Sequence, residues 1–356
     1  MKQRQSNIEL LRILAMLMII DVHYFASCDA AIHTIRFSGN WYVHQIVQSF
    51  GICGVNIFIL ITGFFSLQQR EVKFRKMIDL LVDVAFFGGF GFLLCILVGW
   101  KSFDGKALIK TMFPILFGTR WFVKAYLVLL CLIPFLNLVL NSIRKSSYQK
   151  LLILLTLLFS VWPSFLPHPP IDDYGYGFFH FVYLYCVAGY IRLHVEKYPH
   201  KWLCLACFFL SAVLVCAFSM HGHGYAWAYD FVFVVTEAVS LFLFFAQLKL
   251  QAVWINRLAS CAFGVFLIHT DGFFSVLIYD KLLHCSDLVT GNPWMFLLSA
   301  LVSLPLFYLI GFALESLKKA LFSVSVSPLL DRVPLLKRPF LIERKDENEK
   351  TPDRTV

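Results

Sequence analysis

The sequence predicts an all-α integral membrane protein that crosses the bilayer about ten times, with both termini in the cytoplasm. Of its 356 residues, 59% are hydrophobic and only 15% are charged. Apolar runs recur along the whole chain, and each is long enough to span a bilayer. Lipid offers no hydrogen bonds to backbone groups, so these runs must be helices. The ten expected spans cover residues 8–26, 44–67, 77–99, 120–141, 149–165, 178–194, 202–219, 229–247, 255–279 and 294–317.

The distribution of basic residues predicts the orientation. If the N-terminus is placed inside, only a minority of the 31 Lys and Arg residues fall on the outer side. These outer residues are Arg36, Lys101, Lys106, Lys110, Arg120, Lys124 and Lys281. Such a bias fixes both termini in the cytoplasm and agrees with an even number of spans. The net charge of +9 is therefore explained by membrane topology, and we expect no nucleic-acid partner.

The first span, residues 8–26, carries Arg12 and His23 inside its apolar run. A helix turns about 100° per residue, so this spacing brings the two side chains within roughly 20° of one face and about 16 Å apart along the axis. An uncompensated Arg in a membrane is costly, so we expect this stripe to face a protein interior or a wet cavity. The alternative is an Arg that snorkels to the headgroups and a His that caps the far end.

The second span contains Gly51, Gly54 and Gly63, which would let a neighbouring helix approach closely. A basic hairpin follows, and its exit carries Arg75 and Lys76. Arg75, Asp79 and Asp83 recur every fourth residue, so opposite charges share one helical face. These residues are either a solvated turn with local ion pairs or a cationic dock for an anionic cofactor.

The outer loop before the fourth span contains residues 107–117, which are apolar but too short to cross a bilayer and suit an interfacial or re-entrant piece. Arg120 and Lys124 follow, one helical turn apart. Two neighbouring like charges cost free energy unless an anion lies between them, although both could instead snorkel to the interface. Loop 163–178 is rich in aromatic residues, which suit sugar rings as well as headgroups.

The later spans carry Glu237, without a local partner, and His269. An intramembrane carboxylate is a functional candidate, although Glu237 could instead pair with a distant cation such as Arg12 or Arg120. Cys204 and Cys207 form a CxxC in an apolar run without a second ligand pair, so we expect buried cysteines and no metal site. The chain divides into a membrane domain, residues 1–317, and a polar cytoplasmic tail, 318–356, whose end we expect to be disordered.

Four ordered stretches resemble membrane acyltransferase family 3. SNIELLRILAMLMIIDVHYF resembles the first helix of that family, whose marker is an Arg followed after ten residues by a His, here Arg12 and His23. VNIFILITGFFSLQ resembles the end of its second helix, with Thr62 where Ser is usual. TRWFVKAYLVLLCLIPFLN and FGVFLIHTDGFF are similar to its later segments. Many members carry an Arg-rich run after the second helix. This chain has fewer basic residues there, and Asp79 stands where a further basic residue is common.

The resemblance implies a ten-helix bacterial plasma-membrane protein that takes an acyl group, usually acetyl, from acyl-CoA in the cytoplasm. The usual acceptor is a hydroxyl of a surface polysaccharide or a lipid-linked sugar. Acyl transfer to an alcohol needs a base that titrates near neutrality, which His23 supplies, and positive potential for the anionic donor, which Arg12 supplies. Direct transfer with His23 as base and transfer through an acylated His23 both fit. Arg75 and Lys76 would extend the donor site, and the cavity-lining residues would be Arg120, Lys124, Glu237 and His269.

The main alternative is a transporter or flippase for a polysaccharide precursor or a small molecule, because polar residues scattered through ten helices could line a translocation path. The sequence shows no internal repeat of the kind from which many transporters are built. It also concentrates charge on one stripe of the first helix. Both observations favour the acyltransferase.

Overall fold

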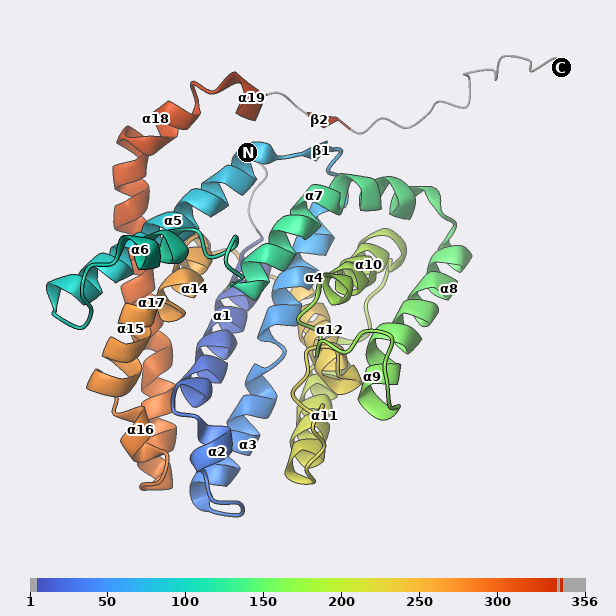
Figure 1. Cartoon of the computed structure of the whole chain (residues 1–356). Coiled ribbons are helices and arrows are strands. Elements are labelled where there is room, and N and C mark those ends of the chain that lie inside the picture. Colours follow the sequence, from blue (N-terminus) through green and yellow to red (C-terminus); the bar gives the residue numbers. More distant parts are fainter. Residues whose placement is uncertain (1–4, 119, 338–339, 342–356) are drawn as a thin grey trace.

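Helices make up most of the part of the chain that the computed structural model describes, namely residues 5–118, 120–337 and 340–341. The described residues also form one antiparallel pair of short strands, in which Glu71 lies opposite Leu341 and Val72 opposite Phe340. This pair ties the C-terminal segment to the hairpin that follows the second predicted span (Figure 1). The expected disorder at the end of the tail falls on residues 342–356, outside the described residues.

The elements follow one another as α1 (Ser6–Ser27), α2 (Ala30–His33), α3 (Gly39–Gly51), α4 (Gly54–Ser66), β1 (Glu71–Val72), α5 (Phe74–Leu97), α6 (Gly105–Met112), α7 (Trp121–Ser142), α8 (Lys145–Thr156), η1 (Leu157–Val161), α9 (Trp162–Phe165), α10 (Phe178–His194), α11 (Lys201–Met220), α12 (Val232–Ala246), α13 (Val253–Ala259), α14 (Ala262–His269), α15 (Gly272–Ser275), η2 (Val276–Leu282), α16 (Cys285–Leu288), α17 (Pro293–Val324), α18 (Val326–Leu330), α19 (Pro334–Lys337) and β2 (Phe340–Leu341). The two η elements are π-helical segments. The predicted domain boundary at residue 317 falls inside α17.

Each predicted span corresponds to a helix or to consecutive helices. Within the described chain, 6 helices are long and apolar enough to cross a membrane, or up to 7 if one bent pair counts as a span. That pair, Val253–His269 and Gly272–Leu282, is bent by 78°. The remaining predicted spans are α1, with 22 residues, and the shorter helices α10 and α12, with 17 and 15. The prediction of an all-α polytopic membrane protein is confirmed.

Helix α1 lies at the centre of the bundle, with α14 and α17 on one side and α3 and α4 on the other (Figure 1). Its buried side chains divide between two hydrophobic clusters. Ile8, Leu11, Ala15 and Ile19 belong to a cluster that includes residues of α4, α10 and α12. Met16, Ile20, Tyr24 and Phe25 belong to a cluster that includes residues of α5, α14 and α17. Both flanks of α1 are therefore covered by other helices.

Small residues allow the close packing that the sequence predicts for the second span. A Cβ atom at Gly54 would lie 2.8 Å from the carbonyl oxygen of Ala15 on α1. A Cβ atom at Gly63 would lie 2.8 Å from the Cβ of Ala188 on α10. Both contacts are shorter than ordinary van der Waals separation, so only glycine fits without a shift. The close approach expected at these positions is confirmed.

We expect Gly63→Ala to destabilise the protein by about 1–3 kcal/mol, because the added methyl group overpacks the contact between α4 and α10. Gly105→Ala is the matched control, since a Cβ there would meet nothing within 4 Å. The melting temperature of the detergent-solubilised protein measures both effects. Equal melting temperatures for the Gly63→Ala variant and the wild type would show that the α4–α10 contact can relax.

Candidate active site

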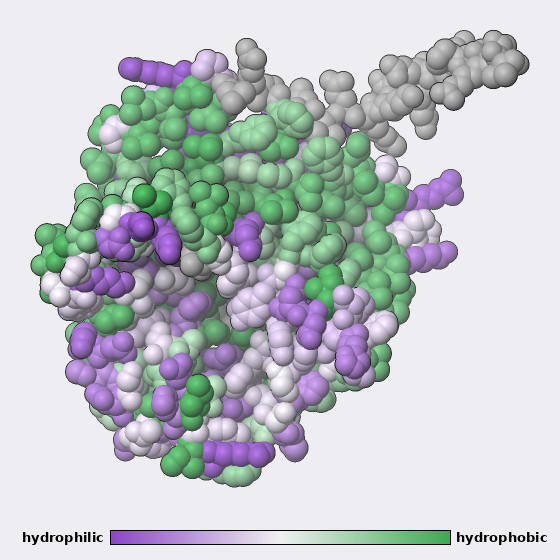
Figure 2. Space-filling model, viewed as in Figure 1, coloured by the Kyte–Doolittle hydropathy of each residue, from purple (hydrophilic) through white to green (hydrophobic). Residues whose placement is uncertain are grey.

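A cavity of ≈ 980 Å³ extends along α1, at the upper end of the range of about 300–1,000 Å³ usual for ligand pockets. Figure 2 shows hydrophilic side chains gathered over the lower part of the viewed face, where the surface is hollowed, and hydrophobic ones over the upper part. The residues of α1 that line the cavity include Glu9, Arg12, Met16, Ile19, His23 and Ser27. Their spacing of three or four residues places them on one face of the helix. The predicted stripe therefore faces a cavity.

Arg12 and His23 lie toward opposite ends of this stripe. The Nε atom of Arg12 donates a hydrogen bond to Oε2 of Glu9 at 3.2 Å, one turn earlier on the same helix. Both side chains remain partly exposed to the cavity. The cation is therefore paired with a carboxylate and yet accessible to a ligand. Lys76 of α5 also lines this cavity.

His23 is held in one orientation by its own helix. Its Nδ1 lies 2.8 Å from the carbonyl oxygen of Ile19, one turn earlier. A carbonyl oxygen can only accept, so Nδ1 carries the proton and donates it. The second ring nitrogen, Nε2, is then left with its lone pair. This is the protonation pattern that a general base requires.

His269 lies directly beside His23. The two rings contact edge to face, with their centroids 4.8 Å apart. Nδ1 of His269 lies 3.0 Å from the carbonyl oxygen of Val265, so this imidazole also keeps an unprotonated Nε2. Among the described residues that nitrogen is buried without a hydrogen-bond partner. Two imidazoles with unprotonated Nε2 atoms therefore lie side by side at the cavity wall, and of the two rings His269 is the more deeply buried.

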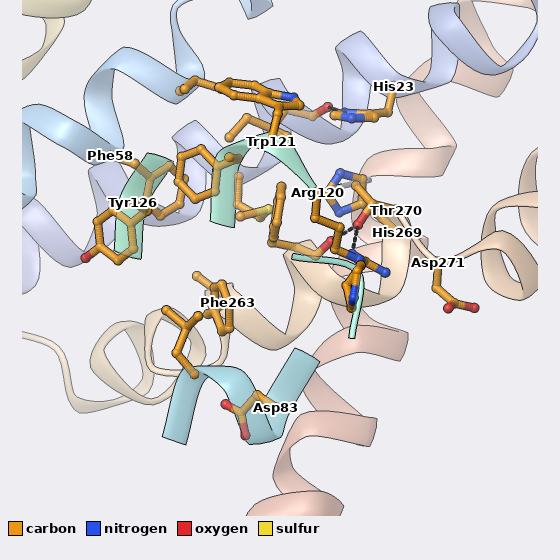
Figure 3. A pocket seen from close by; sticks show the side chains of 18 of the residues that line it. His23, Phe58, Asp83, Arg120, Trp121, Tyr126, Phe263, His269, Thr270 and Asp271 are labelled. Carbon is orange, nitrogen blue, oxygen red and sulfur yellow. Dashed lines mark hydrogen bonds between the residues drawn. The ribbon is translucent and has the colours of Figure 1, made fainter. Parts of the chain in front are cut away.

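A break in the ninth predicted span positions the polar groups next to His269. The bend of 78° between α14 and α15 places Thr270 and Asp271 on the cavity wall. Nη1 of Arg120, at the start of α7, donates a 2.7 Å hydrogen bond to Oγ1 of Thr270 (Figure 3). An arginine side chain keeps its proton in proteins. The guanidinium thus stands as a cation beside the histidine pair.

The other predicted cations are placed differently. Of the described residues, Arg120 and Lys76 line the cavity, but Lys124 and Arg75 do not. Lys124 is exposed. Arg75 donates to Asp79 at 2.8 Å, as the repeat predicts, and also to Asp331 of the C-terminal segment. Its charge is therefore already shared by two carboxylates.

Asp83 does not join this ladder but pairs with α17. The Nζ atom of Lys318 lies 2.7 Å from Oδ1 of Asp83 and 2.8 Å from Oε2 of Glu315. Lys318 and Glu315 are almost fully buried, and Asp83 also lines the cavity. The sequence analysis missed this network, because residues 83 and 318 approach one another only in the folded chain.

We expect Lys318→Met to destabilise the fold by about 3–5 kcal/mol, because it removes the buried cation that lies between the buried Glu315 and the partly buried Asp83. Lys319→Met is the matched control, since the Lys319 side chain is 45% exposed although it also contacts Glu315. Thermal unfolding in detergent provides the comparison. Equal stability of the two variants would contradict a supporting role for the buried network.

Glu237 lies apart from the cavity. It is fully buried on α12, beside the thiol of Cys53, and forms no salt bridge with any described residue. The pairing with Arg12 or Arg120 that the sequence leaves open is therefore not present. Its role in binding an acceptor stays a prediction.

The sequence does not predict that certain polar and aromatic residues meet at the cavity. Trp121, Tyr176 and Tyr229 come from three separate segments and meet on the cavity wall. Thr62 and Tyr126 also line it, with their hydroxyl groups 3.3 Å apart. None of these contacts has a regular spacing, so only the folded structure reveals them.

Comparison with known families places this cavity in context. The Acyl_transf_3 model, described as an acyltransferase domain, matches residues 5–312. Searches of curated proteins and of solved structures returned no match. All of the cavity-lining residues, from Glu9 to Ser275, lie inside the matched range.

Proposed function

Because the chain belongs to the Acyl_transf_3 family of acyltransferases, we propose that it transfers an acetyl group from acetyl-CoA to a hydroxyl of a cell-surface polysaccharide or a lipid-linked sugar. One observation carries this proposal. A single cavity is lined by the cation Arg12 at one end of a helical stripe and by the His23–His269 pair at the other. Donor and acceptor can therefore meet inside one cavity while they enter it from different ends.

The chemistry at His23 is proton transfer. Nε2 of His23 takes the proton of the acceptor hydroxyl as its oxygen attacks the carbonyl carbon of the thioester. The carbon–oxygen bond forms, the carbon–sulfur bond breaks, and the proton passes from His23 to the departing thiolate of CoA. The hydrogen bond to Ile19 keeps Nε2 available throughout. Arg120 supplies positive potential for the developing oxyanion or for an acidic acceptor.

Arg12 serves the donor. Acetyl-CoA is anionic through its phosphates, and a guanidinium binds phosphate by charge-assisted hydrogen bonds. Lys76 adds a second cation to the lining of the cavity. With the N-terminus in the cytoplasm of a bacterial cell, as the charge bias favours, this end of the cavity receives the cytoplasmic donor. The extended pantetheine arm then carries the thioester toward His23.

Membranes that contain the protein, supplied with acetyl-CoA labelled in its acetyl group, test this function. We expect label in the polysaccharide fraction. Mild alkali should release this label, because esters but not amides are cleaved under those conditions. Membranes without the protein provide the background. Alkali-resistant label, or no label above background, would contradict O-acetylation. Label on the protein itself would indicate the acyl-histidine route.

A further inference from the structure

Three aromatic rings form a continuous wall in the cavity. Trp121 stands at the first position of α7, Tyr176 in the loop before α10 and Tyr229 in the loop before α12. Ring centroids are 4.5 Å apart for Trp121 and Tyr176, 5.0 Å for Tyr176 and Tyr229, and 5.6 Å for Trp121 and Tyr229. All three side chains line the cavity. We call this set the aromatic wall.

The two loops that carry the tyrosines are fixed to one another. The backbone N–H of Tyr229 donates to the carbonyl oxygen of Tyr174 at 2.9 Å. Gly175 has a φ of +75°, and a Cβ atom there would lie 2.6 Å from the backbone nitrogen of Asp230. Only glycine satisfies both the backbone angle and the close approach. The aromatic wall is therefore held by backbone contacts and needs no ligand to assemble.

The spacing of the three rings and the neighbouring charge indicate which class of ligand the aromatic wall can bind. Rings at these distances touch one another, so they leave no space between them for a trimethylammonium group, as an aromatic cage would. The half-buried cation of Arg120, adjacent to Trp121 in the chain, also disfavours a cationic ligand. The rings contact one another edge to face or tilted, and such an aromatic surface beside hydrogen-bonding groups suits a ligand with an apolar face and a polar edge. A pyranose ring has this form, with C–H groups on its face and hydroxyl groups at its edge.

The wall is also placed where an acceptor must bind. In Figure 3, Trp121 and His23 lie toward one end of the pocket, with Arg120 nearby, whereas Asp83 lies at the other. We propose that Trp121, Tyr176 and Tyr229 bind a sugar ring of the acceptor and present its hydroxyl to His23. This inference rests on the proposed function, since it names the site at which the acceptor saccharide binds.

The test compares side chains of one loop. Tyr176→Ala removes a ring of the wall, and Tyr176→Phe keeps the ring but loses the hydroxyl group. Tyr174→Ala is the matched control, because Tyr174 is as exposed as Tyr176, at 45%, but stacks on Tyr225 and does not line the cavity. The probe is de-O-acetylated surface polysaccharide, cut to short fragments, from the cells that make the protein. Transfer from labelled acetyl-CoA and equilibrium binding of tritiated fragments are measured on the full chain in nanodiscs.

We expect Tyr176→Ala to raise the KM for the fragments, and their Kd, roughly tenfold, with the KM for acetyl-CoA unchanged. Tyr176→Phe and Tyr174→Ala should retain wild-type values. If the wild type transfers label and Tyr176→Ala has the same KM for the fragments as the wild type, the aromatic wall does not bind the acceptor, but the acetyltransferase activity stands. A raised KM for acetyl-CoA would assign the wall to the donor. An equal rise in Tyr174→Ala would assign the effect to loop folding, and fragments that neither bind nor react with the wild type would refute both proposals.

Discussion

Replacing His23 with Ala is expected to lower kcat for acetyl transfer by roughly 10²–10⁴-fold, the contribution typical of a positioned general base. His23 carries its proton on Nδ1, which is engaged by Ile19, and so offers Nε2 to the acceptor hydroxyl. His269 lies with its ring centroid 4.8 Å away but belongs to the bent segment and has its own fixed position. It cannot take the place of the missing imidazole. The measurement is the rate of ester formation with both substrates at saturation.

The chain offers a close control for this substitution. His221 also has its Nδ1 beside the carbonyl oxygen one turn earlier, that of Ala217, at 2.7 Å. It is exposed at the end of α11 and does not line the cavity. His221→Ala should therefore retain wild-type kcat. If His23→Ala transferred acetyl groups as fast as His221→Ala, His23 would not be the base.

Replacing Arg12 with Ala is expected to raise the KM for acetyl-CoA roughly ten- to a hundredfold, the loss of a charged hydrogen bond worth about 1.5–3 kcal/mol. The guanidinium borders the cavity that Lys76 also lines, and its pairing with Glu9 leaves further N–H groups for phosphate. The KM for the saccharide should stay unchanged, because the acceptor binds toward the His23 end. Initial rates at varied acetyl-CoA concentration provide the value.

Glu9→Gln distinguishes the effect of the Arg12 charge from the effect of its ion pair with Glu9. This variant keeps the cation but removes the carboxylate at 3.2 Å. We expect its KM for acetyl-CoA to be equal to or below the wild-type value, because the guanidinium no longer has an anionic competitor. A KM raised as much in Glu9→Gln as in Arg12→Ala would show that the pair only supports α1.

The cavity-facing side of the first helix could be predicted from the sequence, because the helical repeat alone determines which of its side chains share a face. Arg12 and His23 share a stripe by helical geometry alone, and the structure confirms that this stripe lines a cavity. The glycines of the second span were predictable for a similar reason, since a small residue in an apolar helix indicates close packing. Local spacing also predicted the pairing of Arg75 with Asp79.

Contacts between distant segments could not be predicted in this way. Asp331 binds Arg75 from a tail that the sequence presents only as polar, and Lys318 draws Asp83 away from the predicted ladder. The edge-to-face contact of His23 with His269 depends on the bend between α14 and α15. Such contacts leave no periodic pattern in the chain, because folding alone brings their partners together.

In the proposed reaction, one cavity brings a donor from one membrane face to an acceptor from the other. Proteoliposomes with a single orientation test it most directly, with labelled acetyl-CoA supplied on the side of the chain termini and polysaccharide fragments enclosed on the opposite side. We predict that the enclosed fragments become acetylated, that CoA stays on the donor side and that His23→Ala abolishes the labelling. Acetylation that requires both substrates on one side would contradict transfer of the acetyl group across the membrane. Unmodified fragments that crossed the bilayer would instead identify a transporter.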